Sequence, residues 1–296
     1  MVWCSGHKLA AAVSNAGGLG LLGAGSMTAD ILRDQIHKVK QETPKPFGVN
    51  IPLGRRNVEE LMAVIVDEKV PIVFTSAGNP KLWTAHLQQH NIRVAHVVSS
   101  TTFALKAQQA GVDAIVAEGF EAGGHNGREE TTTLCLIPEV AKHVNIPLMA
   151  AGGIYNGQTM AAAMCLGAEG VQVGTAFALS EESSAHPNFK RHCIGLGEGG
   201  TKLLLKKIGP VRLSQNAWRN KVEEAESRGA SAEELKEILG FGRSKIGIFD
   251  GDLEEGELEI GQASANISEI LPVEVIITNM VSEYKRVLSG LNIPNE

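Results

Sequence analysis

Short runs of consecutive apolar residues recur along this 296-residue chain. The runs do not alternate with polar residues, which is typical of strands buried on both faces of a parallel sheet. Between them, apolar residues recur with helical spacing, so the chain repeats a β-α unit of roughly 20–30 residues. The seven predicted strands are Gly18–Gly25, Phe47–Pro52, Ile72–Gly78, Arg93–Ser99, Ala114–Gly119, Pro147–Ile154 and Gly170–Phe177.

Local signals mark the ends of the predicted helices. Thr28 can cap the helix that follows it, and Pro80 suits the first turn of another. Gly111 and Gly167 suit helix ends, because glycine readily adopts the left-handed conformation found there. The helices predicted between the strands are Ala29–Val39, Val58–Asp67, Pro80–His90, Thr102–Ala110 and Gln158–Leu166.

Repeated right-handed crossovers produce either an open doubly wound sheet or a closed (β/α)8 barrel. A further predicted helix, His7–Ala16, precedes the first predicted strand and has no strand before it. An α/β fold of the TIM (β/α)8-barrel type, lacking its first strand in this chain, explains that order. A seven-stranded open sheet is the alternative. We expect the barrel to occupy residues 1–182.

The pattern changes after the last predicted strand. Residues 183–250 are more charged and helical, and they predict a small helical subdomain with helices at Val222–Arg228 and Ala232–Leu239. Ser231 with Glu234 three residues later is a capping box for the second of these.

Residues 251–296 form the remaining C-terminal segment. The acidic stretch Asp252–Glu259 is interpreted as a solvated turn. A last helix, Pro272–Leu288, is expected to pack back on the barrel.

Charge and composition exclude several classes of function. The net charge is −6 and there is no long basic cluster, which argues against nucleic-acid binding. No apolar run reaches the roughly 18 residues of a membrane span. The four cysteines form no C-x-x-C pair and suit a reducing compartment, so we expect a cytoplasmic protein. A small-molecule substrate is the expected partner, and a homodimer is compatible with the sequence.

The chain has a surplus of glycine, with 33 in all, and this surplus is concentrated where the predicted strands end. In a barrel, the chemistry lies at the carboxyl ends of the strands. Gly152 and Gly153 follow the seventh barrel strand, and Gly174 with Thr175 follows the eighth. Loops at these two positions commonly bind phosphate through backbone N–H groups. The sequence therefore predicts a barrel enzyme that holds a phosphorylated ligand, although each glycine pair alone could be a tight turn.

The loop Glu121–Gly127 carries the polar side chain most suited to catalysis, His125. Flanking glycines would leave its imidazole open to a substrate, and an imidazole can take or give a proton near neutral pH. An ordinary loop histidine is the alternative. The other eight histidines form no H-E-x-x-H or similar pattern, so we infer no metal site. A G-x-S-x-G elbow and a P-loop are also absent. The glycines of Gly17–Gly23 do not form a dinucleotide fingerprint, because they precede and enter a predicted strand instead of following one.

Seven motifs together resemble a known family. They are AAAVSNAGGLGLLGAG, KPFGVNIP, FTSAGNP, AEGFEAGGHNG, PLMAAGGI, GAEGVQVGTAF and EIGQ. They resemble the nitronate monooxygenases, once called 2-nitropropane dioxygenases, and equally the related FMN-dependent enoyl-[acyl-carrier-protein] reductase II. The resemblance covers nearly the whole chain. The combination of A-G-G-H with the later A-G-G-I and Q-V-G-T is specific to this group.

The resemblance implies a barrel that binds FMN non-covalently, with a helical subdomain over the active site. It places His125 at the catalytic histidine. Glu118 occupies a position that is often Gln in nitronate monooxygenases and Glu in the reductase-like branch. The implied flavin contacts are Asn50, Glu118, Gly123, Gly153, Gln172, Val173, Gly174 and Thr175.

One departure concerns the N-terminus. Family members begin with a strand reading roughly P-I-I-Q-G-G-M, which forms the first barrel strand and touches the flavin. Here Met1 occupies the position of the Met that ends this motif. We expect an incomplete gene model or a late start codon. An open barrel edge would lose sheet hydrogen bonds and weaken both stability and flavin affinity.

Three functions are compatible with the resemblance. The first, which it favours, is oxidation of an anionic alkyl nitronate with O2 to a carbonyl compound and nitrite, with His125 binding the nitro group or acting as base. The second is reduction of an enoyl thioester, with NAD(P)H as reductant and His125 orienting the carbonyl or supplying a proton. The third is a truncated relative without catalytic activity. In the first two, FMN carries the redox chemistry.

Overall fold

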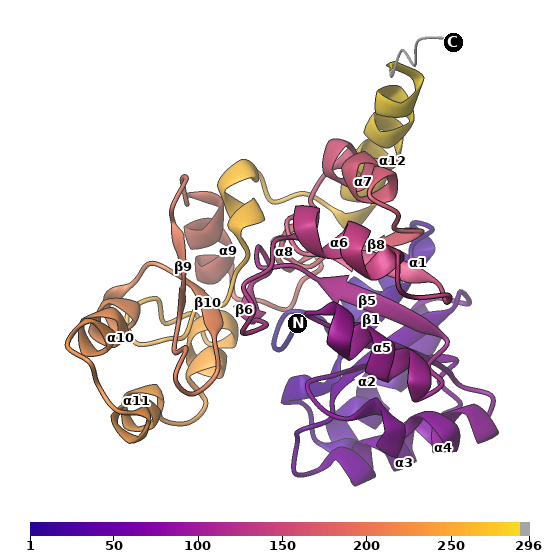
Figure 1. The fold of residues 1–296 in the computed structure, drawn as a ribbon, viewed down its shortest axis with the longest axis horizontal. Coiled ribbons are helices and arrows are strands. Elements are labelled where there is room, and N and C mark those ends of the chain that lie inside the picture. The colour runs from indigo at the N-terminus through magenta and orange to yellow at the C-terminus, as the bar shows by residue number, and fades with distance from the viewer. Residues whose placement is uncertain (291–296) are drawn as a thin grey trace.

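The computed structural model describes residues 1–290 and has two parts, a curled parallel sheet covered by helices and a smaller lobe beside it (Figure 1). The seven strands of the sheet are in the order β1-β2-β3-β4-β5-β7-β8. They are β1 (Gly20–Gly23), β2 (Phe47–Pro52), β3 (Ile72–Ser76), β4 (Arg93–Val98), β5 (Ala114–Glu118), β7 (Leu148–Ala151) and β8 (Gly170–Gln172). Every strand is parallel to its neighbours, and the sheet is an α/β half-barrel, which confirms the predicted barrel-type fold without its first strand.

Helices precede and connect these strands, and their ends follow the predicted signals. Thr28 accepts a hydrogen bond from the backbone N–H of Ile31 and so caps α2. The predicted helix over residues 80–90 is instead a 3₁₀ turn, Pro80–Leu82, followed by α4 after Trp83. The helices are α1 (His7–Asn15), α2 (Ala29–Glu42), α3 (Val58–Asp67), α4 (Thr84–Gln89), α5 (Thr101–Gln109), α6 (Thr133–Ala141) and α7 (Gly157–Cys165).

The last predicted strand is shorter than expected. The sequence predicts a strand over Gly170–Phe177, but β8 ends at Gln172 and α8 (Thr175–Ala178) begins three residues later. The prediction failed because the apolar residues of this helical turn continue the apolar run of the strand. The early end of β8 places Gln172–Thr175 at the rim of the sheet.

The two edge strands, β1 and β8, each pair with one neighbour among the described residues. The N-terminal segment lies beside the end of β1. Ser5 Oγ donates to the Leu21 carbonyl (2.5 Å), and the Gly23 N–H donates to the Ser5 carbonyl (2.9 Å). On its other side, the Cys4 carbonyl accepts from the Ser184 N–H (3.0 Å). Residues 4–5 therefore link β1 to the chain that follows α8.

Apolar side chains pack on both faces of the sheet, as the continuous apolar runs predict. On the outer face, Leu22, Val49 and Val73 pack with apolar side chains of the helices. On the inner face, Phe74, Ala95, Val116 and Ala151 form a second cluster. This inner cluster leaves the carboxyl ends of the strands free to form a site.

The smaller lobe contains α9 (Pro187–Ile194), β9 (Thr201–Leu204), β10 (Val211–Ser214), α10 (Ala217–Ser227) and α11 (Ala232–Leu239). Its core packs around Trp218. Ser231 caps α11 through the Glu234 N–H, which is one half of the predicted capping box, while the Glu234 carboxylate pairs with Arg228. The two strands were not predicted. They form an antiparallel three-stranded sheet with β6 (Gly124–His125), which comes from the loop after β5 (Figure 1).

The last helix, α12 (Val273–Gly290), packs against α7 and α1. Figure 1 shows it beside α7, away from the smaller lobe. The Glu283 carboxylate accepts a hydrogen bond from the Gly157 N–H at the start of α7 (2.8 Å). No helix within residues 1–290 is both long and apolar enough to cross a membrane.

Candidate active site

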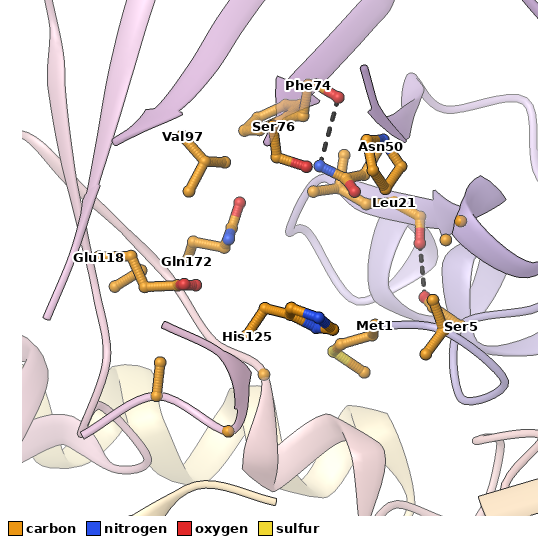
Figure 2. A pocket seen from close by; sticks show the side chains of 18 of the residues that line it. Met1, Ser5, Leu21, Asn50, Phe74, Ser76, Val97, Glu118, His125 and Gln172 are labelled. Atoms are coloured by element: carbon orange, nitrogen blue, oxygen red, sulfur yellow. Dashed lines mark hydrogen bonds between the residues drawn. The ribbon is translucent and has the colours of Figure 1, made fainter. Parts of the chain in front are cut away.

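One large cavity, about 1920 Å³ in volume, opens at the carboxyl ends of the parallel strands. Figure 2 shows side chains from several strands directed into it. The nine residues singled out in the sequence all line this cavity, and their roles remain predictions. They are Asn50, Glu118, Gly123, His125, Gly153, Gln172, Val173, Gly174 and Thr175.

Two amide side chains reach the cavity from opposite ends of the sheet. Asn50, on β2, donates from Nδ2 to the Phe74 carbonyl (3.2 Å). Gln172, at the end of β8, points into the cavity, and its buried Oε1 atom has no hydrogen-bond partner in the described chain (Figure 2). Buried polar atoms in native structures nearly always have a partner. Gln172 Oε1 is therefore a hydrogen-bond acceptor that the described chain leaves unused.

Glu118 lies at the end of β5 and also points into the cavity (Figure 2). Burial raises the pKa of its carboxyl group to about 7, with the positive charge of the N-terminus opposing the shift. A carboxyl group with this pKa is partly protonated at neutral pH. It can then donate a hydrogen bond as well as accept one.

Glycines form the rim next to Gln172. Gly152 and Gly153 follow β7 with φ angles of +92° and +71°, in the left-handed region that glycine adopts without strain. Gly174 precedes α8, and the atom nearest to a Cβ built on it is Met1 Sδ at 3.7 Å. These positions expose backbone to the cavity, and close backbone approach is what a phosphate group needs.

The smaller lobe holds His125 in place. His125 lies in β6, which pairs with β10 through Val211↔His125 and Arg212↔Gly124. The buried Arg212 donates from Nη2 to the Phe120 carbonyl (2.6 Å), and its guanidinium lies 4.3 Å from the centre of the Phe120 ring. The predicted loop histidine is therefore a strand residue, fixed by a lobe that was expected to be only helical.

The acidic stretch at residues 252–259 is not simply a solvated turn. Its first part is exposed, but Glu257 is buried and Glu259 lines the cavity. The alternation of Glu257, Leu258, Glu259 and Ile260 is a two-residue period typical of a strand, and this signal could have identified them. The prediction gave too much weight to the density of charge.

A second histidine, His96, lines the same cavity from β4. Its Nδ1 atom lies 2.7 Å from Thr75 Oγ1. Burial lowers the pKa of His96 to about 4, so this imidazole is neutral at neutral pH. His96 is buried whereas His125 is exposed, so His125 is the better placed of the two to contact a bound ligand.

The fold and the site together define a class of protein. A curled parallel sheet whose strand ends gather polar groups and glycines around one cavity is typical of a barrel enzyme that acts on a small molecule. Residues 1–62 and 53–283 match the family described as Nitronate monooxygenase. The chain belongs to that family, and it is an oxidoreductase.

Three relatives illustrate the range of the family. FabK from Thermotoga maritima superposes with a TM-score of 0.93 and is 41% identical, covering 98% of this chain and 92% of that one. A (3aS,4S,5R,7aS)-5-hydroxy-7a-methyl-1-oxo-octahydro-1H-indene-4-carboxyl-CoA dehydrogenase of Mycobacterium tuberculosis is 30% identical over 95% of this chain and 90% of its own. A probable nitronate monooxygenase of Staphylococcus aureus is 30% identical over 95% and 91%.

Proposed function

We propose that this protein is an FMN-dependent reductase of the carbon–carbon double bond in an enoyl thioester, with a reduced nicotinamide as reductant. FabK, an enoyl-acyl-carrier-protein reductase II, is 41% identical to this chain over almost its whole length. The dehydrogenase relative is named for a substrate that is also an acyl thioester. The nitronate monooxygenase relative is less similar, at 30% identity.

The atoms that line the cavity are of the kinds that FMN would need. The unpartnered Oε1 of Gln172 could accept from a flavin ring N–H. Glu118 and Asn50 line the same cavity and would provide further polar contacts to the flavin. The exposed backbone at Gly153 and Gly174 could receive the phosphate. The residues proposed to hold FMN are those predicted from the sequence: Asn50, Glu118, Gly123, Gly153, Gln172, Val173, Gly174 and Thr175.

When bound, FMN supplies hydride transfer, and the protein supplies position, electrostatics and protons. His125 borders the cavity and can hydrogen-bond the thioester carbonyl or give a proton to the substrate. Its attachment to β10 holds the imidazole in one place relative to the strand ends. Such positioning is a large part of what an enzyme contributes to a reaction between bound groups.

The arrangement that favours reduction is the presence of two carboxyl groups in the cavity lining, Glu118 and Glu257, whose protonated form is favoured by burial. Burial raises the pKa of Glu118 to about 7 and that of Glu257 to about 8. Reduction of a carbon–carbon double bond consumes a proton together with a hydride, so a store of protons serves it directly. Oxidation of a nitronate that is already an anion requires no such store.

A paired assay tests the proposed function. Purified protein supplied with FMN is mixed anaerobically with NADH or NADPH and a crotonyl thioester, and nicotinamide oxidation is followed. In parallel, O2 uptake is measured with propyl nitronate. We expect thioester-dependent nicotinamide oxidation that exceeds nitronate turnover. Nitronate turnover without thioester reduction would overturn the proposal.

Nitronate oxidation is the second candidate function. The family description and the name of the Staphylococcus aureus relative favour it. His125 would then bind the nitro group, as the resemblance implies. The O2-uptake arm of the assay measures this activity directly.

A further inference from the structure

Glu121 is the first residue of the loop that carries His125, and its carboxylate binds the start of α6. Both carboxylate oxygens accept from the Thr133 N–H, Oε1 at 3.1 Å and Oε2 at 2.9 Å. Thr133 is the first residue of α6, and Thr132 before it provides no side-chain cap. Helices begin with N–H groups that need acceptors, and their N-termini favour negative charge. Glu121 therefore caps α6 from a different part of the chain.

The Thr133 hydroxyl joins this cap to the glycine turn after β7. Thr133 Oγ1 lies 2.8 Å from Glu121 Oε2 and 2.8 Å from the Gly152 carbonyl oxygen. A Cβ atom built on Gly153 would lie 3.3 Å from Glu121 Cβ, so the Glu121 side chain packs beside this turn. On the opposite side, a Cβ atom on Gly119 would lie 2.1 Å from Thr133 Oγ1. Only a residue without a side chain leaves room for the hydroxyl group there.

The backbone of Glu121 is joined in turn to the start of α8. The Gln262 N–H donates to the Glu121 carbonyl (3.0 Å), and the Gly261 N–H donates to Thr175 Oγ1 (3.2 Å). A Cβ atom on Gly261 would lie 2.6 Å from Thr175 Oγ1 and 3.0 Å from the Glu121 carbonyl oxygen. Gly261 and Gln262 end the EIGQ motif, so this close approach gives the motif a structural role.

Glu121 thus contacts both glycine-rich turns proposed to receive the phosphate, through Thr133 on one side and residues 261–262 on the other. Within residues 1–290, Glu121 does not itself line the cavity, although Glu118, Gly123 and His125 around it do. Its effect on a bound ligand must therefore pass through these neighbours.

We propose that Glu121 is a positioning residue that fixes the His125 loop relative to the turns after β7 and β8. This inference rests on the FMN site and the enoyl reduction proposed above, because these turns would hold the FMN phosphate while His125 contacts the thioester. A reaction between bound groups depends steeply on their relative placement. Loosening this link should therefore lower kcat more than it raises KM.

The first test compares Glu121→Ala with Glu121→Gln in FMN-saturated, folded protein. In Glu121→Ala, kcat for crotonyl thioester reduction should fall about 10–100-fold, while KM changes by less than about threefold. Glu121→Gln should restore kcat to within about threefold of wild type, because its amide oxygen can accept from the Thr133 N–H and its NH2 group can donate to Thr133 Oγ1. The exposed Glu139→Ala on α6 is the matched control and should behave as wild type.

Two results of this comparison count against a positioning role. If Glu121→Ala lowers only the melting temperature and leaves kcat unchanged, Glu121 is merely structural and the inference is wrong. If Glu121→Gln loses as much activity as Glu121→Ala, the carboxylate charge is what matters and the inference is equally wrong.

The second test uses FMN binding alone, in a cycle of Glu121→Ala, Thr133→Val and the double variant. Thr133→Val keeps the shape of the side chain and removes the hydroxyl group, so it breaks the same link even if Glu121→Ala folds poorly. Each single variant should raise the Kd for FMN about 10-fold, and the double variant should bind about as weakly as either one. Effects that multiply in the double variant would show that the two residues act independently, contrary to the inference. If the wild-type protein binds FMN but does not reduce the thioester, the proposed function fails, and the cycle still decides whether the link exists. If the wild-type protein does not bind FMN, the inference fails together with the cofactor site.

Discussion

The buried Glu257 carboxyl group makes the stability of this protein depend on pH in a specific direction. Burial raises its pKa from an ordinary value of 4.5 to about 8. Between these values the folded protein holds a proton that the unfolded chain has lost. The contribution of the Glu257 carboxyl group to the free energy of unfolding is therefore fully present below pH 4.5 and is lost as pH rises through 8.

The Glu257→Gln variant removes this dependence, because an amide does not titrate. One proton corresponds to about 1.4 kcal/mol per pH unit. Between about pH 5 and about pH 7.5, the free energy of unfolding of the wild-type protein should therefore fall by about 3 kcal/mol relative to that of Glu257→Gln. The stability advantage of the variant should be small in acid and large at neutral pH.

Urea unfolding followed by tryptophan fluorescence measures this difference at several pH values. Protein free of added flavin is used, so that ligand binding does not contribute to stability. Glu254→Gln, an exposed carboxylate in the same segment, is the control and should follow the wild type within about 0.5 kcal/mol. If the difference between wild type and Glu257→Gln stays constant with pH, Glu257 does not hold the proton assigned to it.

Three further changes test the site. His125→Ala should lower kcat for thioester reduction about 10²–10⁴-fold without changing the melting temperature, and equal turnover would remove His125 from the mechanism. Arg212→Met should destabilise the protein to urea by about 1–3 kcal/mol, because it leaves the half-buried Phe120 carbonyl without its donor; an unchanged midpoint would contradict this. Gly152→Ala should cost about 1–3 kcal/mol in the same assay, because φ is +92° and the new Cβ would lie 2.8 Å from the Gly119 carbonyl oxygen; full stability would show that the turn relaxes.

The sequence predicted the parallel sheet well because burial on both faces imposes apolar runs. Strand β2 (Phe47–Pro52) and helix α3 (Val58–Asp67) each have the bounds that were predicted. The strand ends could also be identified, since the glycines and polar residues that follow apolar runs mark them. All nine predicted site residues line one cavity as a result.

The smaller lobe was harder to predict because its structure depends on contacts distant in sequence. Strand β6 is only two residues long and exists because β10, over 80 residues later, pairs with it. Glu257 and Glu259 were predicted to be solvated, because the local density of charge does not indicate the cavity that the fold forms around them. Arg212 was not predicted as a residue that supports the site, because its partner Phe120 lies in another part of the chain.

A fluorescence titration of FMN with purified protein tests whether this cavity holds the cofactor. The wild-type protein should quench FMN fluorescence to saturation at one equivalent. Gln172→Leu, which removes the unpartnered acceptor, should bind about tenfold more weakly, and the exposed Gln89→Leu should match the wild type. Failure of the wild-type protein to bind FMN, or equal affinity in Gln172→Leu, would contradict the site described for this chain.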